Sequence, residues 1–195
     1  MSAPRKRRVP PTLEQLKREL KRERYRRSYG MTLRSTIFSL VCVAAVAVLV
    51  ATLYLPVLQT YGTSMAPTLD DGDIVVSLKT GQLETGDVVA FYYNNRILVK
   101  RVIAGSGDWV DIREDGTVYV NGQALDEPYV SEQAKGSCNI DLPYQVPDGR
   151  WFVMGDHRAV SVDSRDRAVG CVSEEQIVGR LTYRLWPLSR MSPIK

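Results

Sequence analysis

An uninterrupted run without a charged side chain, Ile37–Leu55, constrains the fold of this chain more than any other feature of its sequence. As a helix the run would rise about 28 Å, close to the thickness of the hydrocarbon core of a bilayer. A cleaved secretory signal peptide is the alternative, but its basic region would have to extend from Met1 to Arg34, and no small-x-small cleavage site follows the apolar core. We therefore expect an uncleaved transmembrane anchor over residues 35–56.

Basic residues are concentrated ahead of this anchor. Residues 1–34 hold 12 Lys or Arg and three Glu, a net charge of +9, whereas residues 35–195 carry a net charge of −5. Within this tail, the spacing of Leu13, Leu16 and Leu20 predicts a short basic amphipathic helix, either solvated or attracted to anionic lipid. The positive-inside rule keeps the tail in the cytoplasm and places residues 57–195 outside. Because those residues are acidic overall, no nucleic-acid partner is expected.

The pattern of residues 57–195 predicts a single all-β domain. Short apolar runs predict strands, and the turn Glu114-Asp115-Gly116 predicts a hairpin between residues 109–113 and 117–120. The predicted strands are residues 73–76, 87–93, 97–103, 151–154 and 177–185, and the one helix-like stretch is 173–176. The expected fold is therefore mainly β, with an N-terminal single transmembrane helix followed by one compact β domain.

The cysteine and histidine content limits the chemistry of the chain. Three cysteines are too few for a disulfide-built scaffold, and a single histidine, His157, excludes a multi-histidine metal site. We expect neither a metal nor a cofactor. Cys42 lies in the apolar span, whereas Cys138 and Cys171 lie in the outer domain, where they could pair or remain free.

Two side chains are candidates for nucleophilic chemistry. Ser64 follows closely after Leu55, the end of the apolar run, and on its own it would be an ordinary loop serine. Strand alternation puts Lys100 on the same face as Leu98 and Val102. Burial there would lower the pKa of the lysine, and a neutral amine can activate a serine hydroxyl. The strand pattern alone favours a surface lysine on an edge strand.

Four segments, taken together and in this order behind the anchor, resemble the motifs of the type I signal peptidases, membrane-anchored Ser/Lys proteases that remove secretory signal peptides. The matching segments are Gly62–Leu69, Gly72–Val75, Lys100–Asp108 and Gly155–Arg165. The departures from the family pattern are Ala104 in place of a glycine, His157 where asparagine is usual, and Ala159 and Val160 in place of a polar pair before the serine. The short chain resembles the compact Gram-positive form of the family.

The resemblance implies a role for each matched residue. Ser64 would be the nucleophile, with its backbone N–H as a donor to the oxyanion, and Lys100, neutral because it is desolvated, would be the base. His157 could act as a base in a Ser/His protease, but the Ser/Lys dyad explains base catalysis without it. The implied supporting residues are Ser161, which would orient the lysine amine, an Asp163–Arg165 ion pair, and Asp156 paired with Arg101.

The same resemblance implies the substrate and the surroundings. Apolar pockets beside the nucleophile would admit only small residues at positions −1 and −3 of a signal peptide. Their expected lining is Met65, Leu69, Leu98 and Val99. The expected partners are signal peptides of secretory precursors, the lipid bilayer and the secretion translocon. The expected location is the cell membrane, crossed once, with the N-terminus in the cytoplasm.

Two other functions compete with this interpretation. Self-cleaving repressors use a similar Ser/Lys β fold, but they would need a DNA-binding helix-turn-helix where this chain has its apolar run. A catalytically idle adaptor tethered to the membrane, for instance in surface-fibre assembly, should have lost Ser64 or Lys100, and both are present. A dedicated peptidase for a few pilin-like precursors stays open.

Overall fold

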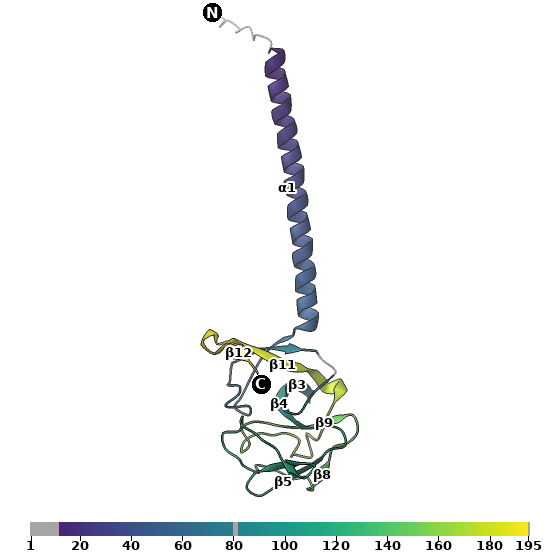
Figure 1. Ribbon diagram of the computed structural model, residues 1–195, viewed down its shortest axis with the longest axis vertical. Helices are drawn as coiled ribbons and strands as arrows, with labels where there is room; N and C mark the ends of the chain where they lie inside the picture. Colours follow the sequence, from purple (N-terminus) through teal and green to yellow (C-terminus); the bar gives the residue numbers. More distant parts are fainter. Residues whose placement is uncertain (1–11, 80–81, 195) are drawn as a thin grey trace, which may run out of the picture. The chain divides into compact units, whose positions relative to one another are not determined.

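The N-terminal part of the chain is one long helix. The structure, a computed structural model, describes residues 12–79 and 82–194, so residues 1–11 of the basic tail lie outside it. Helix α1, Leu13–Tyr54, joins the predicted amphipathic and transmembrane segments without a break (Figure 1). No proline interrupts it, and its one glycine, Gly30, costs only about 1 kcal/mol in a helix interior. By length and composition, α1 can cross a membrane.

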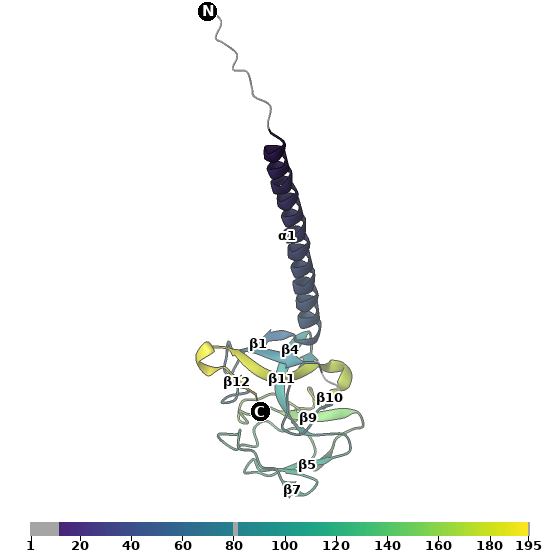
Figure 2. The same cartoon turned by 45° about the horizontal axis from the view of Figure 1, so that its top comes forward.

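The rest of the chain is built on two antiparallel sheets (Figures 1 and 2). Within the described residues the larger sheet has the order β1-β2-β11-β3-β4-β9-β10, and β12 pairs with β11. Its strands are β1 Val57–Gln59, β2 Ile74–Leu78, β3 Val88–Tyr93, β4 Arg96–Ala104, β9 Arg150–Met154, β10 Val172–Ser173, β11 Ile177–Trp186 and β12 Ser192–Pro193. The smaller sheet, in the order β7-β6-β5-β8, contains β5 Trp109–Ile112, β6 Val118–Val120, β7 Gln123–Ala124 and β8 Tyr144–Gln145.

The predicted strands and the hairpin are confirmed as β2, β3, β4, β9, β11 and the β5–β6 pair. The helix-like stretch is a 3₁₀ turn at Glu174–Gln176, and a second such turn occupies Leu188–Arg190. The strands of only two or three residues outside the hairpin were not predicted, because so few residues show no alternation. The strand β1 is the important one among them, since it pairs with β2 immediately before the loop that carries Ser64.

Part of the hydrophobic core lies directly beneath this loop. Met65 and Leu69 from the loop pack with Val75 of β2, Val88 of β3 and Leu181 of β11. All five side chains are at most 4% exposed. Burying a side chain of this size contributes about 1.5–3 kcal/mol, so the loop is held in place by its own apolar residues.

The two cysteines of the β domain do not pair. Cys138 and Cys171 are both free thiols. Cys171 is buried in a second part of the core, together with Phe152 and Met154 of β9. Burial raises the pKa of its thiol, so it behaves there as a small apolar side chain.

A buried ion pair connects the loop after β7 to the loop after β9. The side chains of Glu127 and Arg158 are both fully buried. Arg158 donates two hydrogen bonds to Glu127, from Nη1 to Oε2 over 3.0 Å and from Nη2 to Oε1. Its Nε donates a third, 3.1 Å long, to the carbonyl oxygen of Gly155. Arg158 thereby ties the smaller sheet to the start of the polar loop Gly155–Arg165.

We predict that Glu127→Gln lowers the free energy of unfolding by about 3–5 kcal/mol, because it leaves the Arg158 charge buried without a counter-charge. The control is Asp141→Asn in the exposed Arg167–Asp141 pair, where the loss should stay below about 1 kcal/mol. The measurement is urea unfolding of the full chain in detergent, followed by tryptophan fluorescence. Equal small losses in both variants would show that the buried pair is not needed for the fold.

Candidate active site

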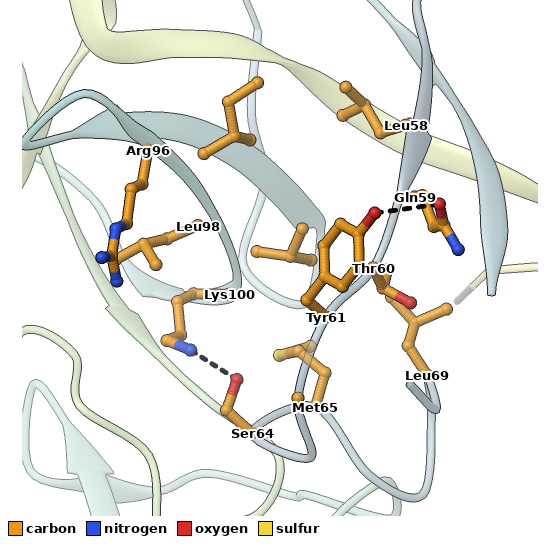
Figure 3. A pocket seen from close by; sticks show the side chains of 13 residues that line it. Leu58, Gln59, Thr60, Tyr61, Ser64, Met65, Leu69, Arg96, Leu98 and Lys100 are labelled. Carbon is orange, nitrogen blue, oxygen red and sulfur yellow. Dashed lines mark hydrogen bonds between the residues drawn. The ribbon is translucent and has the colours of Figure 1, made fainter. Parts of the chain in front are cut away.

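Ser64 and Lys100, far apart in the sequence, meet at the surface of the larger sheet. Ser64 lies in the loop after β1, and Lys100 lies in the middle of β4. The distance between Lys100 Nζ and Ser64 Oγ is 2.7 Å, a short hydrogen bond (Figure 3). A nucleophile and a base at this separation can exchange a proton directly.

Lys100 is buried rather than exposed. Lys100 is only 3% exposed, so the interpretation of this residue as a surface lysine is wrong. Burial lowers the pKa of Lys100 from 10.5 to about 8, while the nearby carboxylates Asp163 and Asp156 raise it and Arg165 lowers it. Desolvation is the largest of these effects, because burial removes the water that would stabilise the ammonium form. Near neutral pH an appreciable fraction of Lys100 is therefore an unprotonated amine.

The backbone around Ser64 is fixed by hydrogen bonds as well as by the core. Thr60 Oγ1 donates to the carbonyl oxygen of Asp70 over 2.6 Å, which closes the base of the loop. The carbonyl oxygen of Ser64 accepts a 3.1 Å hydrogen bond from the backbone N–H of His157. A Cβ atom on Gly155 would lie 2.4 Å from the same oxygen and 2.2 Å from Ser161 Oγ. Only glycine at position 155 allows the polar loop to approach Ser64 this closely.

His157 makes its side-chain contact to the backbone and not to the hydroxyl of Ser64. Its ring nitrogen Nδ1 lies 3.3 Å from the carbonyl oxygen of Thr63. A carbonyl oxygen only accepts hydrogen bonds, so Nδ1 is the protonated nitrogen of the ring in this contact. The geometry therefore supports a loop histidine that holds the backbone and offers nothing for a Ser/His dyad.

The predicted Arg101–Asp156 pair is present and buried. Arg101 donates from Nε to Oδ1 over 2.9 Å and from Nη2 to Oδ2 over 2.7 Å. Thr68 Oγ1 donates to the same carboxylate over 2.5 Å, and the ring of Tyr129 lies 3.9 Å from the guanidinium carbon. The pair thus joins β4, at the residue after Lys100, to the loop that carries Ser64 and to the polar loop.

The predicted Asp163–Arg165 pair is also present and buried. Arg165 donates from Nε to Oδ1 and from Nη2 to Oδ2, each over 2.8 Å. The second oxygen of Asp163 also accepts from the backbone N–H of Gly155 over 2.9 Å. Arg165 reaches on to the carbonyl oxygen of Lys135 over 2.7 Å. The pair closes the polar loop upon itself and holds Gly155 against Ser64.

Ser161 is the one predicted site residue that does not make its expected contact. It is buried beside Gly155, and its Oγ has no hydrogen-bond partner among the described residues. The amine of Lys100 makes its hydrogen bond to Ser64 instead. The Lys100–Ser161 hydrogen bond that the resemblance implies is therefore not formed in this structure.

An apolar cavity of about 500 Å³ opens beside the Ser64–Lys100 pair (Figure 3). The four predicted pocket residues, Met65, Leu69, Leu98 and Val99, all line it. The remaining wall comes from β1 and the residues after it, among them Leu58 and Tyr61, and from Arg96 and Ile97 at the start of β4. Leu58 and its neighbours were missed because β1 was not predicted, although they immediately precede the predicted Gly62–Leu69 motif. Across the described chain, no cluster of three or more His, Cys, Asp or Glu could hold a metal ion.

Comparison with known proteins identifies the family. The model of the family described as "Signal peptidase, peptidase S26" matches residues 33–186. Signal peptidase IB of Staphylococcus aureus (strain COL) is 45% identical over 148 residues, covering 66% of this chain and 76% of that protein. Signal peptidase I T of Bacillus subtilis (strain 168) is 36% identical over 147 residues, covering 69% of this chain and 75% of that protein. A crystal structure of a signal peptidase I from Enterococcus faecalis V583 aligns with a TM-score of 0.45 and 30% identity, covering 52% of this chain and 97% of that one.

The family match includes the apolar part of α1 and ends at Trp186, the last residue of β11. It therefore contains both loops and the strand that form the Ser64–Lys100 site. The two relatives quoted share more than a third of their aligned residues with this chain, and the aligned regions cover about three quarters of each of them. The chain belongs to the signal peptidase family, peptidase S26, whose members are serine endopeptidases.

Proposed function

We propose that this chain is a type I signal peptidase that cleaves secretory precursors after small-x-small motifs, with Ser64 as the nucleophile and Lys100 as the general base. One observation carries the assignment of the two residues. The hydroxyl of Ser64 lies 2.7 Å from an amine whose pKa burial lowers to about 8. A serine hydroxyl is a weak nucleophile unless a base removes its proton, and this amine is the base within reach.

Acylation begins when the unprotonated amine of Lys100 takes the hydroxyl proton of Ser64. The oxygen attacks the carbonyl carbon at the end of the signal peptide, and the tetrahedral oxyanion receives a hydrogen bond from the backbone N–H of Ser64. When the peptide bond breaks, the Lys100 ammonium returns the proton to the leaving nitrogen. The mature chain departs as a free amine and the signal peptide stays as an ester on Ser64.

Deacylation repeats the same proton path with water. The unprotonated Lys100 removes a proton from a water molecule, which attacks the ester, and the ammonium then reprotonates Ser64.

We propose that Ser161 assists while Lys100 is charged. An ammonium has three N–H donors, and the buried Ser161 hydroxyl is an acceptor without a partner among the described residues. The Asp163–Arg165 and Arg101–Asp156 pairs act by holding the loops.

The apolar cavity supports selection of small side chains. Met65 and Leu69 are buried at its floor, and Leu58, Leu98 and Val99 line its walls. No carboxylate or permanently charged side chain other than Arg96 lines it within the described residues. The small apolar side chains of an extended Ala-x-Ala segment can enter such a cavity without removing water from a polar group.

The anchor supplies the location. We propose that residues 1–34 form a cytoplasmic tail, residues 35–56 cross the bilayer once, and residues 57–195 form the extracytoplasmic catalytic domain. The short segment between Leu55 and Ser64 spans at most about 30 Å. An anchored enzyme would thus meet its precursors near the membrane surface, where the translocon delivers them, and confinement would raise their effective concentration.

We predict that Ser64→Ala and Lys100→Ala each reduce cleavage of an Ala-x-Ala precursor by about 10⁴-fold, because each removes one half of a unit that acts together. The assay uses the full chain in liposomes, with a circular dichroism check of folding. His157→Ala is the matched control and should keep most of the activity, because its ring contacts the backbone of Thr63 and not the dyad. Retained cleavage in either dyad variant would mean that the nucleophile or the base is misassigned.

We predict that kcat/KM of the wild type rises with pH and levels off above an apparent pKa near 8. Only the unprotonated amine can take the proton from Ser64, and the free enzyme loses that proton around pH 8. The measurement is initial cleavage rates at low precursor concentration between pH 6 and pH 9.5. A profile that is flat across this interval would contradict the role of Lys100 as the base.

We predict that Lys100→Met is more stable than the wild type at pH 7 and that its advantage shrinks as pH rises from 8 to 10.5. In that interval the folded wild type binds fewer protons than its unfolded chain, so its free energy of unfolding rises with pH, by about 3 kcal/mol in total. The control is Lys79→Met, which removes a lysine at an exposed position. Urea unfolding at pH 7, 8.5 and 10 measures both differences, and parallel behaviour of the two variants would show that burial of Lys100 is not linked to its protonation.

A further inference from the structure

A second cavity, of about 560 Å³, also opens at the Ser64–Lys100 pair. More than half of its lining is shared with the apolar cavity, namely Tyr61, Gly62, Ser64, Arg96, Leu98 and Lys100. It is bounded by Thr63, by Tyr93 and Asn94 at the β3–β4 turn, and by Val160 and Val162 of the polar loop. In Figure 3, Arg96 and Leu98, which line both cavities, lie on one side of the Lys100–Ser64 hydrogen bond, and Leu58, Gln59 and Leu69, which line only the apolar cavity, lie on the other.

The second cavity is placed to receive the leaving part of the substrate. This step rests on the proposed function, in which the small residues at the end of the signal peptide occupy the apolar cavity. A chain that crosses Ser64 and fills the apolar cavity with its acyl part must continue away from that cavity beyond the scissile bond. The adjoining space contains the exposed side chains of Val160 and Val162 and can accommodate the first residues of the mature protein.

The charge lining this second cavity is positive. No Asp or Glu contributes to its wall in the described residues, and of its two basic residues only Arg96 is exposed and permanently charged. No hydrogen bond or ion pair with a described residue engages the Arg96 side chain, so its donors are available to a ligand. Lys100, in contrast, is buried and has a lowered pKa.

We propose that Arg96 is a specificity-determining residue that reads the charge of the early mature sequence. An acidic side chain at the second or third position after the cleavage site would pair with the guanidinium, and a basic one would be repelled. Exposed charge pairs are weak, so the expected preference between Asp and Lys at one position is about three- to tenfold in kcat/KM. The enzyme would accept both kinds of precursor and process acidic mature ends faster.

The test compares three precursors that share one Ala-x-Ala signal peptide and differ only in Asp, Asn or Lys at the second mature residue. A second set varies the third residue. For each full-length enzyme in liposomes of neutral lipid, the quantity measured is the ratio of kcat/KM between the Asp and Lys precursors. Neutral lipid is used so that the membrane itself does not sort the precursors by charge. For the wild type, the ratio should be about three to ten in at least one of the two sets and should fall toward one in about 0.5 M salt.

Substitutions of Arg96 separate its charge from its bulk. Arg96→Gln should bring the ratio close to one, Arg96→Lys should keep it above one, and Arg96→Glu should invert it. The matched control is Arg113→Gln in the β5–β6 hairpin, where the guanidinium lies over the ring of Tyr119 at 4.3 Å and lines neither cavity. That variant should keep the wild-type ratio.

Different outcomes overturn different statements. Equal cleavage of all precursors by the wild type, or an Asp/Lys ratio unchanged in Arg96→Gln, would overturn the role of Arg96 and leave the proposed function intact. Failure of the wild type to cleave any of the precursors would overturn the proposed function and this inference with it. A ratio that drops equally in Arg113→Gln would show that the effect comes from net charge rather than from the cavity.

Discussion

The removal of Lys100 from water is the constraint on which the rest of this site depends. An amine with an unshifted pKa of 10.5 would be almost wholly protonated at neutral pH and could not act as a base, whereas burial brings the pKa to about 8. The same burial destabilises the folded chain, because the charged form of the lysine has lost its solvent. Strand β4 accommodates this cost by placing Lys100 between sheet neighbours that are apolar and closely packed, with Val89 of β3 opposite it in the register. Lys100, whose burial is energetically unfavourable, thus lies in a strand that is paired with a neighbouring strand on each side.

Ion pairs hold the two loops against this strand. Arg101 and Arg165 are both fully buried, and each makes a two-pronged hydrogen bond with a carboxylate, Asp156 and Asp163 respectively. Buried pairs of this kind contribute little net stability compared with apolar side chains, but breaking one is strongly destabilising. Their value here is geometric, since they bring Gly155 against Ser64 and prevent the polar loop from moving away. The resulting placement depends on two-pronged hydrogen bonds whose geometry a longer or shorter side chain would not reproduce.

The sequence predicted the long strands, the hairpin and the contact between Ser64 and Lys100, but it did so by two different routes. The strands follow from apolar runs and alternation, which residues 87–93 and 97–103 show clearly. The strand pattern favoured a surface position for Lys100, and only the match of four motifs to a known family indicated the dyad. The features that the sequence did not predict were a short strand and a side-chain direction that depends on three-dimensional packing. The short strand β1 has no periodicity, so the wall containing Leu58 was missed, and the direction of the Ser161 hydroxyl depends on packing that no local pattern encodes.

The position of Arg96 follows from the same strand that positions Lys100. Residues 96, 98 and 100 share one face of β4, so the strand carries a cation at its start, an apolar residue next and the buried amine last. Leu98 lies between the guanidinium and the amine along this face, and it lines both cavities with them. A charged residue at position 98 would bring water to the amine and restore its pKa toward 10.5. In the function proposed above, a positive charge at position 96 and an unprotonated amine at position 100 can therefore coexist on one strand face, because an apolar side chain stands between them.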